Sequence, residues 1–94
     1  MIFVVRLPQI LLRPLIGAKI KVLYSRDPTL TNLEGEIVFE TRNTFDVLTK
    51  KGIKTIIKKI CIFEIQIKNH KIIVDGKYLE NRLRRLHKLG KKRR

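Results

Sequence analysis

The sequence predicts a mainly β protein, built as a small six-stranded antiparallel barrel with a short N-terminal helix and a basic C-terminal helix. Two observations predict this fold. Apolar and polar residues alternate over several short runs, which is the pattern of half-buried strands. Residues that favour turns, namely Asp27-Pro28, Asn43, Gly52 and Asn69, separate the runs, so we expect the connections to be loops and tight turns. At 94 residues the chain has room for one small hydrophobic core, so we expect one barrel.

The first strand is predicted over residues 19–24. Ile20, Val22 and Tyr24 alternate there against lysines, so we expect these three side chains on the apolar face of the strand. Asp27-Pro28 then marks a loop.

A β-hairpin is predicted between residues 36 and 48. Ile37 and Phe39 form its apolar face, and Glu36 and Glu40 form an acidic face that we expect to meet solvent.

The turn of this hairpin is predicted at Arg42-Asn43-Thr44. Asn43 tolerates a positive φ where a tight turn needs it. Placing Phe39 opposite Phe45 or Val47 requires a loop of odd length, and we expect a β-bulge beside it.

Three further strands complete the six. They are predicted over residues 53–59, 61–67 and 71–74, with turns at Lys50-Lys51-Gly52 and Lys68-Asn69-His70. Six short strands joined by tight turns are typical of a small barrel.

Helices are predicted on both sides of the barrel in the sequence. Pro8 can open a short helix that Pro14 would end. Asp75 is suited to be the N-cap of a second helix, which Gly90 would stop. The chain therefore divides into an N-terminal extension (residues 1–18), the barrel (19–75), and a basic C-terminal helix and tail (76–94).

The N-terminal extension is markedly apolar. It either packs on its own barrel or docks another protein. The residues that would dock a partner are Leu7, Ile10, Leu11, Leu12 and Leu15.

The charge of the chain points to a polyanionic partner. Lys and Arg outnumber Asp and Glu by 22 to 8, for a formal net charge of +14. The longest uninterrupted apolar run, Met1 to Val5, is too short to span a membrane, so we expect a soluble intracellular protein. Its single cysteine, Cys61, lies in an apolar run and is expected to be a buried small hydrophobe.

Basic residues gather at the C-terminus, where residues 77–94 hold nine of them against one acid, Glu80. Each phosphate that such a segment neutralises adds affinity for any RNA sequence. The six aromatic residues mostly occupy apolar strand positions, so we expect recognition of folded RNA by shape and phosphate rather than base stacking. The candidate RNA-binding residues are Arg42, Lys54, Lys58, Arg82, Arg84, Arg85, Lys88, Lys91 and Lys92.

The sequence holds no catalytic constellation and no metal site that we recognise. Glu36 and Glu40 would lie about 13 Å apart in an extended strand, too far to share a metal ion. His70 falls in a turn and His87 in the basic helix, with no reason to converge. Zinc-ligand spacing and a phosphate-binding glycine loop are also absent.

Ordered motifs along the chain resemble two related families. The segment Gly35 to Leu48 resembles the first signature of Sm-like proteins. Over roughly residues 10 to 85 the chain resembles the protein component 1 family of ribonuclease P, archaeal and eukaryotic. The motifs that carry this resemblance are Leu15-Ile16-Gly17, Ser25-Arg26-Asp27-Pro28-Thr29-Leu30, Leu33-Glu34-Gly35, Glu40-Thr41-Arg42-Asn43-Thr44 and Ile62-Phe63-Glu64.

This resemblance implies a six-stranded Sm-like barrel with flanking helices. It also implies a cytoplasmic protein subunit of ribonuclease P (EC 3.1.26.5), the endoribonuclease that removes the 5′ leader from precursor tRNA. The RNA subunit would perform the hydrolysis with Mg²⁺, and this chain would bind no cofactor. Its partners would be the ribonuclease P RNA, precursor tRNA, a zinc-ribbon protein subunit bound through the N-terminal segment, and other ribonuclease P proteins.

One departure limits the likeness to Sm proteins. Ile62-Phe63-Glu64 stands where an Sm ring protein would carry an Arg-Gly pair, so neither the ring nor its base-binding pocket is expected. Two alternative functions stay open: another Sm-like or ribosome-associated RNA-binding protein, and a stand-alone endoribonuclease.

Overall fold

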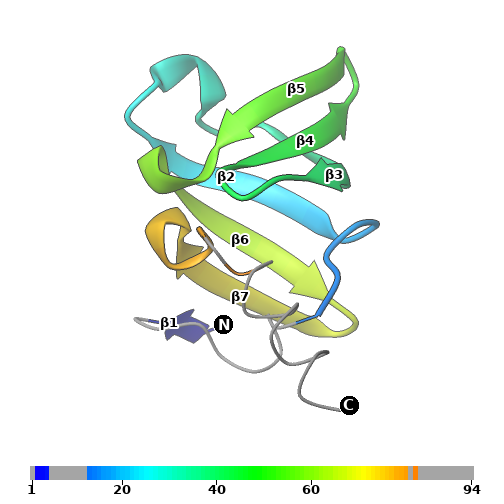
Figure 1. Cartoon of the computed structure of the whole chain (residues 1–94), viewed down its shortest axis with the longest axis vertical. Coiled ribbons are helices and arrows are strands. Elements are labelled where there is room, and N and C mark those ends of the chain that lie inside the picture. Colours follow the sequence, from blue (N-terminus) through cyan, green and yellow to red (C-terminus); the bar gives the residue numbers. More distant parts are fainter. Residues whose placement is uncertain (1, 5–12, 81, 83–94) are drawn as a thin grey trace.

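The structure is a computed structural model that describes residues 2–4, 13–80 and 82 (Figure 1). It contains seven strands and three short 3₁₀ turns. The strands are β1 (Ile2–Val4), β2 (Lys19–Ser25), β3 (Glu34–Glu40), β4 (Thr44–Thr49), β5 (Gly52–Ile57), β6 (Cys61–Ile67) and β7 (His70–Asp75). The 3₁₀ turns are η2 (Pro28–Leu30), η3 (Lys58–Ile60) and η4 (Gly76–Tyr78).

All strands belong to one sheet, in the order β1-β7-β6-β2-β3-β4-β5. The six strands β2 to β7 pair antiparallel, which confirms the predicted mainly β, six-stranded antiparallel arrangement. β1 adds a seventh strand parallel to β7, inside the segment that the sequence placed in an extension.

The sheet curls around a single core. Phe45 on β4 and Phe63 on β6 meet edge to face, with ring centroids 5.5 Å apart. Two strands lie between β4 and β6 in the sheet, and in a flat sheet these strands would be about 14 Å apart. The pairing of the described strands still has two edges, β1 and β5, so the sheet is open and the predicted closed barrel is not confirmed.

The predicted helices differ in their outcome. Asp75 is an N-cap as predicted, but the turn that it caps is η4, a 3₁₀ turn, and its carboxylate accepts a hydrogen bond from the Lys77 amide. The N-terminal helix falls largely on residues 5–12, and most of the C-terminal helix falls on residue 81 and residues 83–94, all outside the described residues. In the part of the chain that the structure describes, no helix is long and apolar enough to cross a membrane.

Inward-facing apolar side chains from β2 to β7 fill the core. Leu15, just before β2, and Leu79, just after η4, complete it from the two ends of the described chain. The remaining buried apolar residues are Ile20, Val22, Ile37, Phe45, Val47, Ile56, Cys61, Phe63, Ile65, Ile67, Ile72 and Val74.

A β-bulge in β2 changes which side chains face this core. Val22 pairs with Phe63 and Tyr24 pairs with Ile62, so Leu23 is an extra residue on its strand. One extra residue shifts the alternation that follows it to the opposite face. Tyr24, predicted on the apolar face, is therefore 55% exposed, whereas Ser25 is buried.

A second bulge does the same in β3. Ile37 pairs with Val47 and Phe39 pairs with Asp46, so Val38 is the extra residue. Phe39 consequently faces solvent, and Glu40 turns into the protein. The predicted bulge is present, but the pairing of Glu40 with Phe45 leaves an even number of residues, Thr41 to Thr44, in the loop. The expected odd-length loop and the expected pairing of Phe39 with Phe45 or Val47 are therefore wrong.

The loop of the β3–β4 hairpin is closed by threonines rather than by an Asn with positive φ. The Thr41 amide donates to the Thr44 carbonyl (2.9 Å), and the Thr44 amide donates to the Thr41 hydroxyl oxygen (3.1 Å). Asn43 is not among the residues with positive φ, so the loop does not use it as predicted.

Candidate nucleic-acid interface

The predicted RNA-binding residues separate into three groups in the structure. Arg42, in the β3–β4 loop, and Lys54, on edge strand β5, are exposed. Lys58 and Arg82 are fully buried, each at 0% exposure. The other five, Arg84, Arg85, Lys88, Lys91 and Lys92, lie outside the described residues.

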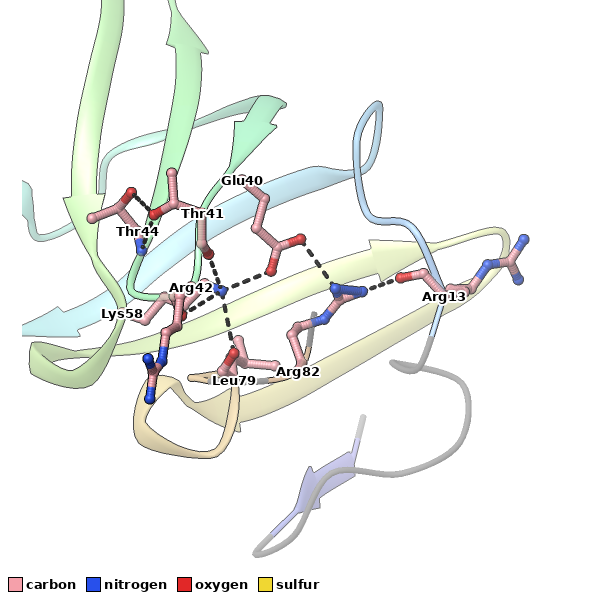
Figure 2. A network of polar contacts seen from close by, with 8 residues as sticks. All are labelled: Arg13, Glu40, Thr41, Arg42, Thr44, Lys58, Leu79 and Arg82. Atoms are coloured by element: carbon pink, nitrogen blue, oxygen red, sulfur yellow. Dashed lines mark hydrogen bonds and ion pairs between the residues drawn. The ribbon is translucent and has the colours of Figure 1, made fainter. Parts of the chain in front are cut away.

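The two buried cations share one carboxylate. Lys58 Nζ lies 2.7 Å from Glu40 Oε2, and Arg82 Nη1 lies 3.0 Å from Glu40 Oε1 (Figure 2). Glu40 itself is only 9% exposed. The cationic groups of Lys58 and Arg82 therefore face the protein interior, where they cannot contact an RNA phosphate, and this corrects the surface position predicted for them.

Lys58 shares its three N–H donors between the Glu40 carboxylate and backbone carbonyl oxygens. Its Nζ donates to Thr41 O (2.8 Å), Arg42 O (3.3 Å) and Leu79 O (3.2 Å), and it lies 4.8 Å from the centre of the Phe45 ring. One ammonium group thus fastens the β3–β4 loop to the segment that follows η4.

Burial sets the protonation behaviour of both cations. Loss of solvation lowers the pKa of Lys58 from its ordinary value, and the hydrogen bond and negative charge of Glu40 oppose that shift. Burial also lowers the pKa of Arg82, again opposed by the charge of Glu40. The negative charge of Glu40 therefore compensates the buried positive charges of Lys58 and Arg82.

Arg82 links this network to the other end of the described chain. Its Nη2 donates a hydrogen bond to the carbonyl oxygen of Arg13 (Figure 2). Arg13 directly follows residues 5–12, and Arg82 lies just before residues 83–94. The apolar N-terminal segment and the basic C-terminal segment therefore leave the described fold at neighbouring points.

Gly76 makes this arrangement possible by letting η4 pack against η3. A Cβ atom at Gly76 would lie 1.7 Å from the carbonyl oxygen of Lys58 and 2.9 Å from the Phe63 ring. Only glycine permits such a close approach, which brings the carbonyl of Leu79 within reach of Lys58.

The sequence could not show Glu40 as the centre of this site. Its partners are 18 and 42 residues away in the chain, and the alternation alone placed Glu40 on a solvent face. Of the residues predicted to dock a protein partner, Leu15 is instead part of the protein's own core, at 1% exposure. Leu7, Ile10, Leu11 and Leu12 lie outside the described residues.

The groups considered for catalysis are dispersed. Glu34 and Glu36 are exposed on β3, and Glu40 is occupied by two cations. His70 is exposed at the start of β7. Over residues 2–4, 13–80 and 82, no three His, Cys, Asp or Glu side chains are grouped so that they could hold a metal ion.

Cys61 is buried, as predicted. Its thiol lies 3.4 Å from the Ser25 hydroxyl oxygen. Burial raises the pKa of the thiol, and the hydrogen bond with Ser25 opposes that shift. A raised pKa keeps the group in its unreactive thiol form at neutral pH.

Comparison with known proteins connects this fold to ribonuclease P. The family model for "Ribonuclease P/MRP, subunit p29" matches residues 8–88. A protein of Sulfurisphaera tokodaii named "Ribonuclease P protein component 1" is 46% identical over 69 residues, which cover 73% of this chain and 90% of the relative. The protein of the same name from Methanocaldococcus jannaschii is 35% identical over 74 residues, which cover 78% of each.

A solved structure agrees with these relatives. It is described as "Structure of Mth11: A homologue of human RNase P protein Rpp29", and it aligns with a TM-score of 0.56 and 27% sequence identity. The alignment covers 68% of this chain and 85% of the other. The family model spans most of the sequence, and the curved antiparallel sheet is shared with a homologue of known structure, so the chain belongs to the ribonuclease P/MRP subunit p29 family.

Proposed function

We propose that this chain is an RNA-binding protein subunit of ribonuclease P that assists the catalytic RNA in removing the 5′ leader from precursor tRNA. The observation that carries this proposal is the family match over residues 8–88. The net charge of +14 supports it independently, because a basic chain of this kind is suited to neutralise RNA phosphates.

The chemistry belongs to the RNA subunit in this proposal. Metal-assisted hydrolysis of a phosphodiester needs carboxylates gathered around metal ions. Here the buried carboxylate, Glu40, is neutralised by Lys58 and Arg82, and two other acids of β3, Glu34 and Glu36, face solvent. The chain would contribute positive charge and a rigid surface, while Mg²⁺ would be bound by the RNA.

The proposed RNA contacts lie on two parts of the chain. Arg42 and Lys54 are exposed on the β3–β4–β5 part of the sheet. The larger contribution would come from the basic residues after Arg82, namely Arg84, Arg85, Lys88, Lys91 and Lys92.

The protein partner in this proposal is a zinc-ribbon subunit of ribonuclease P, in a cytoplasmic ribonucleoprotein. It would dock on the apolar segment that includes Leu7, Ile10, Leu11 and Leu12. The contact between Arg82 and the Arg13 carbonyl supports this placement, because it anchors the end of that segment to the sheet.

The same proposal includes the architecture of the whole chain. The curled sheet would close into an Sm-like barrel, and helices would flank it. The chain would divide into residues 1–18, 19–75 and 76–94.

Deleting residues 88–94 should weaken binding to ribonuclease P RNA in a salt-dependent way and leave the sheet folded. The deletion removes Lys88, Lys91, Lys92, Arg93 and Arg94. Each lost phosphate contact should flatten the plot of log affinity against log salt concentration by roughly 0.7 to 0.9. A full-length variant with these five residues changed to Gln is the matched control, because it keeps the length and removes the charge. An unchanged slope in both variants would show that the segment does not contact RNA.

A further inference from the structure

A basic hollow lies at the end of the sheet where β2 finishes and β6 begins. Its volume is about 330 Å³, and its charged and aromatic lining consists of Tyr24, Arg26, Lys59, Asp75 and Lys77. Figure 1 shows η3 and η4 next to each other at this end of the sheet. The hollow is distinct from the Glu40 network and from the basic residues that follow Arg82.

Three cations reach this hollow from three separate segments on a fixed backbone. Arg26 directly follows β2, and its amide donates to the Ile60 carbonyl (2.9 Å), which ties that end of β2 to η3. Lys59 belongs to η3 and Lys77 to η4, the two turns that Gly76 allows to pack closely. Lys77 Nζ also lies 5.2 Å from the centre of the Tyr78 ring, a cation–π contact that restrains the Lys77 side chain.

The lining is positive, in contrast to that of a larger hollow elsewhere on the described surface. Asp75 is the acid among the lining residues, and its carboxylate already accepts the Lys77 amide as an N-cap. The larger hollow, about 420 Å³ in volume, carries almost balanced charges. It is lined by Lys19, Lys21, Lys50 and Lys71 against Glu34, Glu36 and Glu64. An anion would therefore be favoured at the end of β2 rather than over the outer face of the sheet.

The aromatic ring of Tyr24 gives this hollow a second kind of contact. The β2 bulge turns the ring outward, and it is 55% exposed beside the three cations. An exposed aromatic ring next to positive charges is the combination that binds single-stranded nucleic acid, because the bases stack on the ring while the cations neutralise phosphates. A free phosphate or an acidic peptide would use the cations but would leave the ring without a stacking partner.

We propose that this hollow binds a nucleotide of single-stranded RNA, with its base stacked on Tyr24 and its phosphate held among Arg26, Lys59 and Lys77. The inference rests on the proposed RNA-binding function and adds a site for an unpaired nucleotide to it. None of these four residues is among the nine candidate RNA-binding residues named in the sequence analysis, although Lys77 begins the basic segment 77–94.

Binding of fluorescein-labelled decauridylate to the full chain, followed by fluorescence anisotropy, tests the stacking contact. Tyr24→Ser should raise the Kd at least about fivefold, the lower end of what a lost base stack costs. Tyr24→Phe keeps the ring and should stay within about twofold of the wild type. Because Tyr24 is exposed, both variants should keep the melting temperature of the wild type. A folded Tyr24→Ser variant with an unchanged Kd would overturn the proposal.

A charge-matched pair of triple variants tests the phosphate contact. The first variant carries Arg26→Gln, Lys59→Gln and Lys77→Gln. It should flatten the plot of log affinity for decauridylate against log salt concentration by up to about 2, since each contact to single-stranded RNA contributes about 0.7 to the slope. The control carries Lys19→Gln, Lys68→Gln and Lys71→Gln, which remove the same charge at the opposite end of β2 and β6. Equal effects of the two triple variants would show that only the overall charge matters, and the proposed site would be wrong.

Two further outcomes separate this inference from the proposed function. If the wild type binds ribonuclease P RNA but not decauridylate, the single-strand site is refuted and the subunit function stands. If the wild type binds neither RNA, the proposed RNA-binding function itself fails.

The variants also distinguish a nucleotide site from a general anion surface. If the triple variant at Arg26, Lys59 and Lys77 loses binding while Tyr24→Ser binds decauridylate fully, the surface binds anions in general and the nucleotide site is refuted.

Discussion

Changing Glu40 to Gln should lower the free energy of unfolding by about 3–5 kcal/mol, because removing one partner of a buried ion pair leaves the opposite charge uncompensated. In this protein the carboxylate compensates two cations, Lys58 and Arg82, both at 0% exposure. A domain of ordinary stability has only about 5–15 kcal/mol in total, so the loss should be large. Urea denaturation followed by circular dichroism measures it.

Glu36→Gln is the matched control for this change, since Glu36 is an exposed acid on the same strand. It should alter the stability by less than about 0.5 kcal/mol. Lys58→Met should also cost less in the Glu40→Gln background than in the wild type, because the two side chains are directly coupled. Equal urea midpoints of unfolding for Glu40→Gln and Glu36→Gln would show that the ion pairs of Glu40 with Lys58 and Arg82 do not stabilise the fold.

Gly76→Ala should destabilise the protein by about 1–3 kcal/mol, the usual cost of forcing extra atoms into a packed site. The added Cβ would lie 1.7 Å from the Lys58 carbonyl oxygen, so the backbone of η3 or η4 must move. That movement would separate Lys58 from the carbonyl of Leu79 and weaken the junction between the two turns.

Lys77→Ala is the control, because Lys77 is exposed on the same 3₁₀ turn and its backbone amide still donates its hydrogen bond to the Asp75 carboxylate. Its free energy of unfolding should change by less than about 0.5 kcal/mol. A Gly76→Ala variant as stable as Lys77→Ala would mean that η3 and η4 are not as closely packed as the structure places them.

The strand pattern was predictable because alternation is a local property, and it located all six antiparallel strands. The two bulges were harder to place, because a bulge is defined by the pairing of two strands that are distant in the sequence. Each bulge reversed the side chains that follow it, so Tyr24 and Phe39 were assigned inward and Glu40 outward, opposite to their observed positions.

Buried charges were missed for a related reason. A basic residue in a basic sequence is expected on the surface, since Lys and Arg are rarely buried without a partner. The partner of Lys58 and Arg82 became available only when the β3 bulge turned Glu40 inward. The β3 bulge therefore explains why Glu40 is not on the solvent face. It also explains why Lys58 and Arg82 are not on the proposed RNA-binding surface. Strand β1 was missed because its three residues are too few to show a period.

The most direct test of the central claim is the cleavage of precursor tRNA by a reconstituted ribonuclease P, assembled from the RNA subunit and its proteins with and without this chain. We expect the chain to increase the cleavage rate, to show no cleavage on its own, and to leave no activity once micrococcal nuclease has destroyed the RNA. Metal-dependent cleavage by the RNA-free chain, abolished by changing Glu34 or Glu36, would contradict the claim that it is a non-catalytic RNA-binding subunit.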